Sequence, residues 1–254
     1  MKKYILFVDS GLGGINLLAE SVKIMPHENF IYFADTKNLP LGNKSKFKIR
    51  KIICKILKRQ IKKHRIKMVV FACNTATAAA VKYARKKFKL PIVGIEPAIK
   101  KAADKCSARG ADKNILLIAT KATVKHSEIV KKYKNLKNIN IIKDKNLAKL
   151  IDDNLSGKII EDYILKTYGK YAGADAVVLG CTHYIFALDS FKKCFKNARF
   201  FESSIYVARR IKQVLLNNKE YNRAGQGEVL FCESGHTDKL EKFKKVYYEL
   251  RLRG

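Results

Sequence analysis

The sequence predicts an α/β protein with two similar domains, mainly parallel sheets and an active site in the cleft between the domains. Three observations indicate this fold. Short apolar runs alternate with stretches of helical periodicity, polar residues directly follow several of those runs, and two strand-end segments recur at nearly one spacing. The 254 residues are 47% hydrophobic, which is enough for a large core. No apolar run approaches the roughly 20 residues of a membrane-spanning helix.

Six apolar runs are predicted to be strands. The first covers residues 4–8 and ends in an Asp-Ser-Gly-Leu-Gly-Gly turn, after which helical periodicity begins at Ile15. Because ligands of open parallel sheets bind beyond the carboxyl ends of the strands, the residues that follow each strand are the candidates for chemistry. The other predicted strands cover residues 30–33, 67–72, 92–95, 114–119 and 176–180.

An internal repeat supports two similar halves. Residues 68–75 match residues 176–183 at an offset of 108. Residues 5–10 match residues 115–120 at an offset of 110. Two strand-end motifs at nearly one offset indicate pseudo-symmetric halves, which we expect to face each other.

The composition is strongly basic, with 53 Lys and Arg against 22 Asp and Glu and a formal charge of +31. The densest stretch, Lys44–Lys67, holds twelve Lys or Arg and no acid. Apolar residues recur in it at helical spacing, so its lysines are expected to form the solvated face of an amphipathic helix. Such a surface binds nucleic acid only weakly and non-specifically, and it attracts a small dianionic substrate.

The cysteines and the amino-terminal residues bear on the compartment. Six cysteines occur without a Cys-x-x-Cys pair, and no zinc-type histidine spacing is present. The first apolar run leads into an aspartate and glycines, where a secretory signal would have a small-residue cleavage site. We therefore expect reduced thiols in a cytoplasmic protein that has no metal and no membrane partner.

Cys73 and Cys181 directly follow strands, one in each half. If the halves face each other, the two thiols approach one cleft from opposite sides. That arrangement suits racemisation, in which one base removes a proton from a stereocentre and another group returns a proton to the opposite face. Asp9 follows the first strand and His183 lies two residues after Cys181, so each can assist or orient a thiol.

Small polar side chains near both cysteines suit the binding of carboxylates. Two other interpretations remain open: a cysteine after a valine run is commonly a packed core residue, and Cys181 with His183 could be half of a metal site, although no second pair of ligands is spaced to complete it. The glycines at 11–14 lack the order of a phosphate-binding loop and are expected to form a tight turn. The small polar residues are Ser10, Asn74, Thr75, Thr120, Thr123 and Thr182.

These motifs resemble those of glutamate racemases, in the cofactor-independent aspartate/glutamate racemase superfamily. The opening Asp-Ser-Gly-x-Gly-Gly motif and the two cysteine motifs, in this order and spacing, are specific to that group. The matching segments are Asp9–Gly14, Tyr32–Thr36, Pro40–Gly42, Ala72–Ala76, Gly94–Pro97, Thr120–Thr123 and Leu179–Tyr184.

The resemblance implies an enzyme that interconverts L- and D-glutamate without a cofactor and supplies D-glutamate for peptidoglycan synthesis. Cys73 and Cys181 would be the two bases, supported by Asp9 and His183 respectively. Asp152 would stand in for a glutamate of the family. The implied substrate contacts are Asp9, Ser10, Asp35, Leu41, Gly42, Asn74, Thr75, Thr120, Thr123, Thr182 and His183.

The resemblance also implies an organisation and partners. The first domain would comprise residues 1–97 with 208–254, so that the carboxyl-terminal segment returns to it, and the second would comprise residues 98–207. No pyridoxal phosphate, metal or nucleotide is implied, and a homodimer is expected.

Five positions depart from the family pattern. Leu41 replaces a tyrosine, Lys149 a proline, Asp152 a glutamate, Ile185 a proline and His236 an aspartate. None of these changes removes a proton-transfer group. They leave open a racemase of another amino acid such as aspartate, and the +31 charge leaves open a polyanion-binding protein on a racemase-like scaffold.

Overall fold

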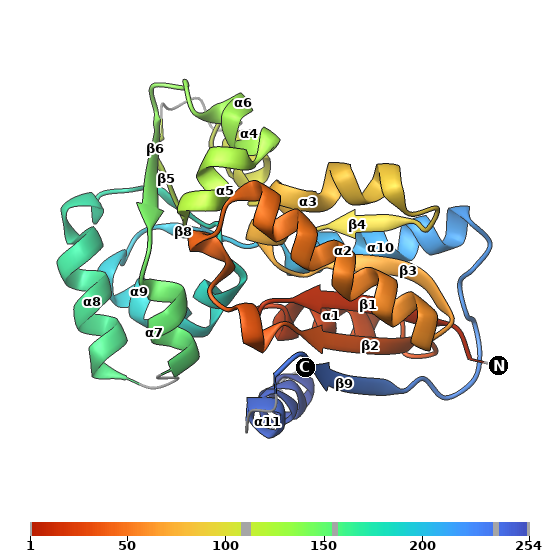
Figure 1. Cartoon of the computed structure of the whole chain (residues 1–254). Coiled ribbons are helices and arrows are strands. Elements are labelled where there is room, and N and C mark those ends of the chain that lie inside the picture. The colour runs from red at the N-terminus through yellow and green to blue at the C-terminus, as the bar shows by residue number, and fades with distance from the viewer. Residues whose placement is uncertain (1, 108–112, 154–156, 236–238, 253–254) are drawn as a thin grey trace. The chain divides into compact units, whose positions relative to one another are not determined.

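The computed structural model describes residues 2–107, 113–153, 157–235 and 239–252 (Figure 1). Contacts between Cα atoms divide the chain into two compact units. Unit 1 comprises Met1–Ile95 with Ser204–Gly254, and unit 2 comprises Glu96–Ser203. These bounds lie within four residues of the domain limits expected from the sequence, although the assignment of folding domains stays a prediction.

Unit 1 is built on a five-stranded parallel sheet in the order β4-β3-β1-β2-β9. Its strands are β1 (Tyr4–Asp9), β2 (Asn29–Ala34), β3 (Ile66–Phe71), β4 (Ile92–Gly94) and β9 (Val229–Glu233). Its helices are α1 (Ile15–Ile24), η1 (Thr36–Asn38), η2 (Leu41–Asn43), α2 (Lys46–Lys63), α3 (Asn74–Lys87), α10 (Ser204–Asn217) and α11 (Lys239–Leu252).

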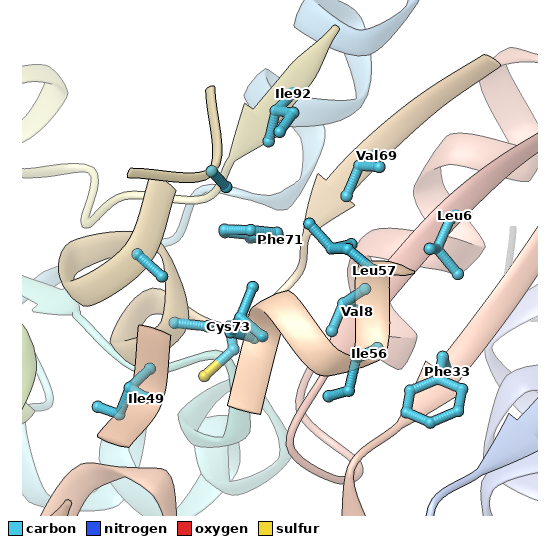
Figure 2. Close-up of a cluster of buried hydrophobic side chains, with 14 of the residues drawn as sticks. Leu6, Val8, Phe33, Ile49, Ile56, Leu57, Val69, Phe71, Cys73 and Ile92 are labelled. Atoms are coloured by element: carbon cyan, nitrogen blue, oxygen red, sulfur yellow. The ribbon is translucent and has the colours of Figure 1, made fainter. Parts of the chain in front are cut away.

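Helices cover both faces of this sheet. Side chains alternate between the faces along each strand, so Leu6, Val8 and Phe71 pack with α2 and α3 on one side (Figure 2). Helix α1 contacts α10 and α11 in the other layer. The cluster between the sheet and α2 includes Cys73, which is therefore anchored by the core although it stands at the end of a strand.

The carboxyl-terminal segment returns to the first sheet. Strand β9 pairs in parallel with β2, from Phe30 opposite Val229 to Ala34 opposite Glu233. Figure 1 shows β9, in blue, beside the red β2. The return sets Ser234 beside the loop that follows β2, where its hydroxyl donates a hydrogen bond to the Asp35 carboxylate at 2.7 Å.

Unit 2 has a four-stranded parallel sheet in the order β6-β5-β7-β8. Its strands are β5 (Ile115–Thr120), β6 (Ile139–Asp144), β7 (Ala176–Leu179) and β8 (Arg199–Phe201). Its helices are α4 (Ile99–Ser107), α5 (Lys121–His126), α6 (Glu128–Tyr133), α7 (Leu147–Asp153), α8 (Lys158–Tyr168), η3 (Gly169–Tyr171), η4 (Thr182–Ala187) and α9 (Leu188–Cys194). One apolar cluster joins the sheet to α7, α8 and α9, and another joins its opposite face to α4 and α6.

The two sheets share one topology, which explains the internal repeat. When β3 is matched with β7 and β1 with β5, the order β4-β3-β1-β2 of unit 1 becomes the order β8-β7-β5-β6 of unit 2. Strand β9 is the addition in unit 1. The predicted α/β class with two parallel sheets and similar halves is confirmed.

Helix α2 follows the predicted amphipathic pattern. Ser45 caps its amino terminus by accepting a hydrogen bond from the Lys48 amide at 3.2 Å. Ile49, Ile53 and Leu57 are buried against the sheet, whereas the lysines on the opposite side of the helix are exposed. The expected solvated face is therefore present along the helix.

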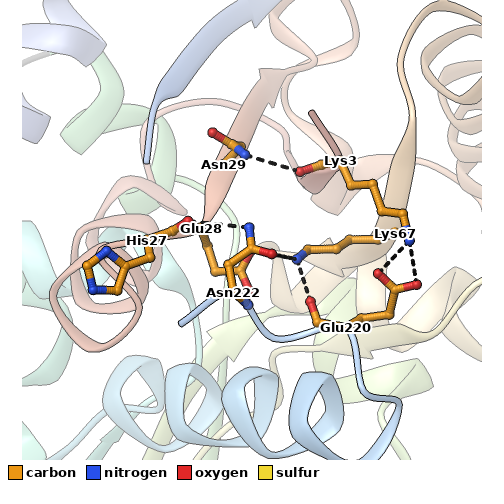
Figure 3. Close-up of polar contacts among 7 residues, drawn as sticks. All are labelled: Lys3, His27, Glu28, Asn29, Lys67, Glu220 and Asn222. Carbon is orange, nitrogen blue, oxygen red and sulfur yellow. Dashed lines mark hydrogen bonds and ion pairs between the residues drawn. The ribbon is translucent and has the colours of Figure 1, made fainter. Parts of the chain in front are cut away.

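Lys67, the last residue of the basic stretch, contradicts the expectation of a solvated lysine. It belongs to β3, and its ammonium pairs with the Glu28 carboxylate at 2.6 Å (Figure 3). Both side chains are almost fully buried, at 2% and 0% exposure. The Lys67 ammonium also donates to the Glu220 carbonyl at 2.6 Å. This lysine is buried because its partners, which lie far away in the chain, replace the water that it loses.

Candidate active site

Cys73 stands where β3 ends and α3 begins. Its backbone is extended, with φ −117° and ψ 124°, and it is the cap residue that precedes the first turn of α3. The amino terminus of a helix carries a partial positive charge, which stabilises negative charge on a sulfur placed there. Because β1 pairs with β3, the residue after β1 lies beside Cys73, and the Ser10 hydroxyl is 3.7 Å from the Cys73 sulfur.

Asp9 is held by the turn that follows β1. Its Oδ2 accepts hydrogen bonds from the amides of Gly11 at 3.1 Å and Gly14 at 3.0 Å. The Tyr32 hydroxyl lies 3.1 Å from the same oxygen and 2.7 Å from the Gly11 carbonyl. With 1% of its surface exposed, Asp9 is fixed beneath the turn that carries Ser10. The glycines form the tight turn that was predicted, with Asp9 at its centre.

Gly14 leaves no room for a side chain. A Cβ there would lie 2.6 Å from the Ala72 Cβ and 3.1 Å from the Asp9 Cβ. We expect Gly14→Ala to displace Asp9, to destabilise the protein by about 1–3 kcal/mol and to lower activity. Urea unfolding and steady-state kinetics measure both effects. Gly173→Ala is the matched control, because nothing lies within 4 Å of a Cβ at that position. Equal behaviour of the two variants would contradict this account of the turn.

The first turn of α3 supplies further polar groups beside Cys73. Asn74 and Thr75 are both buried, at 4% and 3% exposure. The side-chain oxygen of Asn74 has no hydrogen-bond partner among the described residues. Segment η2, which carries Leu41 and Gly42, lies against α3. The Leu41 side chain packs into the apolar cluster that contains Cys73. Only the backbone groups of Leu41 are therefore candidates for polar contacts in the site.

Asp35 is joined to the protein by several contacts. Its amide donates to the Asp9 carbonyl at 2.8 Å, and its Oδ1 accepts from Asn38 at 2.9 Å and from Ser234 at 2.7 Å. Asp35 therefore links the loops that follow β1, β2 and β9. A direct contact between Asp35 and substrate stays a prediction.

Cys181 has the equivalent position in unit 2. It follows β7 with an extended backbone, φ −137° and ψ 136°, and precedes the short helix η4. Its sulfur lies 3.8 Å from Nδ1 of His183. The other ring nitrogen of His183, Nε2, lies 3.7 Å from Oδ1 of Asp152, on α7. Because Asp152, His183 and Cys181 are all buried, the carboxylate can orient the imidazole toward the sulfur.

The threonines of unit 2 have separate local roles. Thr120 caps α5: its Oγ1 accepts from the Thr123 amide at 3.2 Å and lies 2.9 Å from the Thr123 hydroxyl. Thr182 opens η4, and its hydroxyl is buried with no hydrogen-bond partner among the described residues. Of the positions that depart from the family pattern, Ile185 packs against the apolar cluster, and His236 lies outside the described residues.

Asp144, which the sequence analysis missed, organises the surroundings of Cys181. Its Oδ1 accepts from the amides of Asn146 and Leu147 at 2.8 and 2.7 Å, which caps α7. Its Oδ2 accepts from the hydroxyls of Tyr163 at 2.7 Å and Tyr168 at 2.6 Å. Asp144 thereby fixes the start of the helix that presents Asp152. Asp144 ends β6, opposite Thr120 of β5, and the sequence offered no signal for it because β6 was not predicted.

This cluster predicts an alkaline titration. Burial and the hydrogen bond to Asp144 raise the pKa of Tyr163 to about 12. The unfolded chain releases this proton near pH 10 and the folded chain retains it, so this contribution to stability is present below pH ~10 and is lost as the pH rises toward 12. In a spectrophotometric titration, Tyr163→Phe should remove tyrosinate absorbance near pH 12 and none near pH 10. A loss near pH 10 would contradict the assignment.

Burial also raises the pKa values of Tyr168 and Tyr184, and the neighbouring Asp144 carboxylate adds to the effect. Both phenols therefore stay neutral beside Cys181. All six cysteines are free thiols. Within the described ranges, no three His, Cys, Asp or Glu side chains are grouped so that they could hold a metal ion. None of the helices in those ranges is long and apolar enough to cross a membrane.

The sequence model of the family described as Asp/Glu/Hydantoin racemase matches residues 15–196, which is more than half of the chain. The chain belongs to this family. Within it, the chain groups with the glutamate racemases, since it is similar over nearly its full length to two curated members. Glutamate racemase 2 of Bacillus subtilis is 34% identical, with 95% of this chain and 94% of the relative covered. Glutamate racemase of Clostridium kluyveri is 37% identical, with 93% of each covered.

A solved structure shows the same fold in this family. Escherichia coli glutamate racemase, crystallised with L-glutamate and an activator, superposes with a TM-score of 0.81 at 26% identity, with 98% of this chain and 96% of that chain covered. The family resemblance noted from the sequence is therefore confirmed. That the Cys73 and Cys181 regions face each other across a cleft stays a prediction.

Proposed function

We propose that this chain interconverts L- and D-glutamate with Cys73 and Cys181 as the two acid/base groups and without a cofactor. One observation carries the proposal: each unit places one buried cysteine at the carboxyl end of equivalent strands, β3 and β7, and in front of a helix. Each sulfur also adjoins one polar side chain, Ser10 in unit 1 and His183 in unit 2.

The reaction needs a base on each side of Cα. A thiolate on one side takes the Cα proton, the electron pair of the C–H bond passes into the adjacent carboxylate, and the thiol on the other side donates its proton to Cα. We assign removal of the proton from D-glutamate to Cys73 and from L-glutamate to Cys181. In the proposal, Asp9 supports the Cys73 side, and His183 with Asp152 supports the Cys181 side.

Substrate binding follows from the groups beside the two cysteines. Amides and hydroxyls of Ser10, Asn74, Thr75 and Thr182 are proposed to bind the two carboxylates and the amino group. Related enzymes support glutamate as the substrate: the Escherichia coli structure contains L-glutamate, and the Francisella tularensis glutamate racemase was solved with D-glutamate. The remaining implied contacts, at Asp35, Leu41, Gly42, Thr120 and Thr123, are part of the same proposal.

The decisive experiment is proton exchange. Purified protein in D2O, with L-glutamate and no added cofactor, should give D-glutamate that carries deuterium at Cα, as followed by NMR and circular dichroism. Aspartate and alanine are the control substrates and should not be racemised. If aspartate were racemised and glutamate were not, the chain would be an aspartate racemase. Leu41 would then be the first residue to test as the cause of the changed substrate.

Asp152→Asn tests the His183 side. The change is isosteric but removes the charge that orients the imidazole, so we expect kcat/KM to fall by about tenfold to a hundredfold. It must fall equally in both directions because the two enantiomers have equal free energy. The pH profile of kcat/KM should also shift. Asp153→Asn, on the adjacent exposed residue, is the control and should behave as the parent.

We further propose a homodimer in the cytoplasm whose D-glutamate enters peptidoglycan synthesis. Analytical ultracentrifugation of the purified chain tests the dimer, and a single monomeric species at micromolar concentration would contradict it. Complementation of a D-glutamate auxotroph tests the cellular role. Growth without added D-glutamate is the expected result, and loss of growth in the Cys73→Ala strain is its control.

A further inference from the structure

We propose that the outer surface of α2 and α3 binds single-stranded nucleic acid, an activity separate from racemisation. The first observation is charge. Helix α2 contains no acidic residue over its 18 positions. Five of its exposed cations form no ion pair with a carboxylate among the described residues: Lys48, Lys51, Lys55, Lys58 and Arg59.

The second observation is an aromatic side chain that is exposed and does not belong to the apolar core. Phe47 is 78% exposed, although the other apolar residues of α2 face the core or are half-buried. Burying a phenylalanine stabilises a protein, so its exposure on a polar helix leaves a flat apolar surface for a ligand. Tyr83 on α3 lies nearby, with the Arg50 guanidinium 5.3 Å and the Lys87 ammonium 5.5 Å from its ring centre.

The third observation is that this surface is hollowed. A cavity of about 560 Å³ lies between α2 and α3, and no acidic residue lines it. A second cavity, of about 370 Å³, lies on the other flank of α2, where Lys48 and Arg59 meet the loop after β2. One acidic side chain, Asp35, also lines this second cavity, and its carboxylate accepts hydrogen bonds from Asn38 and Ser234. Lys51 and Lys55 line both cavities, so the two form one basic track across α2.

A basic track with interleaved aromatic rings has the chemistry of single-strand binding. Lysines and arginine neutralise successive phosphates, and unpaired bases stack on exposed rings. A duplex keeps its bases stacked internally and cannot use Phe47, whereas inorganic polyphosphate has no bases. The combination of basic side chains and an exposed aromatic ring therefore favours single-stranded nucleic acid over a duplex and over polyphosphate.

Fluorescence anisotropy with a labelled oligothymidylate of about 12 nucleotides tests the proposal. We expect saturable binding at low salt that weakens as salt is added. Phe47→Ala, which leaves the charge unchanged, should weaken binding by about tenfold, since stacking of one base contributes on that order. Lys51→Gln with Lys55→Gln should weaken binding and reduce its salt dependence.

Matched control variants distinguish binding at this site from attraction by the overall positive charge of the protein. Tyr248→Ala removes an exposed ring from α11, and Lys242→Gln with Lys245→Gln removes two cations from the same helix; both should bind as the parent does. Racemisation should be unchanged in Phe47→Ala. Three results would overturn the proposal: no saturable binding, equal binding of parent and Phe47→Ala, or binding of a duplex or of polyphosphate as tight as that of the single strand.

Discussion

Replacement of either Cys73 or Cys181 by alanine is expected to lower racemisation by about 10²–10⁴-fold, the usual contribution of a general acid or base. The loss should be equal in both directions, because the equilibrium constant between enantiomers is one. In the proposed mechanism each face of Cα needs its own proton carrier, so neither cysteine can replace the other. Polarimetry in H2O and NMR in D2O measure inversion and exchange separately.

Deuterium exchange at Cα in each single variant shows which cysteine acts on which enantiomer. If Cys181 serves L-glutamate, Cys73→Ala should retain slow deuterium exchange of L-glutamate without inversion, and Cys181→Ala should do so only with D-glutamate. Cys106→Ala and Cys194→Ala are the controls, since these thiols are buried in apolar clusters of unit 2 and belong to no proposed site. Either active-site variant keeping more than a few per cent of parental turnover would contradict the two-base mechanism.

The central strands could be predicted from the sequence because they are continuous apolar runs. Strands β1, β3, β5 and β7 are buried over nearly their whole length, and each was found. The three missed strands, β6, β8 and β9, all lie at the edges of their sheets. An edge strand has fewer buried side chains, so its apolar pattern is weak: β9 is only half-buried at every position.

Part of the candidate site could be predicted from the sequence for the same reason. Cys73, Ser10 and Cys181 follow central strands, and the contact between Ser10 and Cys73 follows from the pairing of β1 with β3. The family resemblance indicated Asp152 as a site residue, but its contact with His183 was not predicted, because Asp152 comes from α7, a separate helix.

The surroundings of Cys181 could not be predicted from the sequence. The Asp144 carboxylate meets Tyr163 and Tyr168, which are 19 and 24 residues further along the chain on α8. No local pattern marks an aspartate that will accept two phenolic hydrogen bonds, since tertiary packing alone brings them together. For the same reason Lys67 was taken for a surface residue.

That buried lysine leads to the largest expected effect on stability. Lys67→Met should destabilise the protein by about 3–5 kcal/mol, because it leaves the Glu28 carboxylate buried without its cation. One oxygen of Glu28 would keep the amide of Asn222, at 2.8 Å, but the oxygen facing Lys67 would have no cation. The segment after α10 would also lose the bond from Lys67 to the Glu220 carbonyl. Urea unfolding followed by circular dichroism measures the change.

Two further variants decide whether the lost charge pair is the cause. Lys67→Met combined with Glu28→Gln removes both charges, so the double variant should recover part of the loss and show a coupling of more than about 1 kcal/mol in the double-mutant cycle. Lys3→Gln breaks the exposed ion pair to the Glu220 carboxylate and should change stability by less than about 1 kcal/mol. If Lys67→Met were no more destabilising than Lys3→Gln, the buried pair of Lys67 with Glu28 would not contribute to the stability of unit 1. If the double variant were as unstable as the sum of the two single variants, the loss would come from packing of the lysine stem and not from an uncompensated charge.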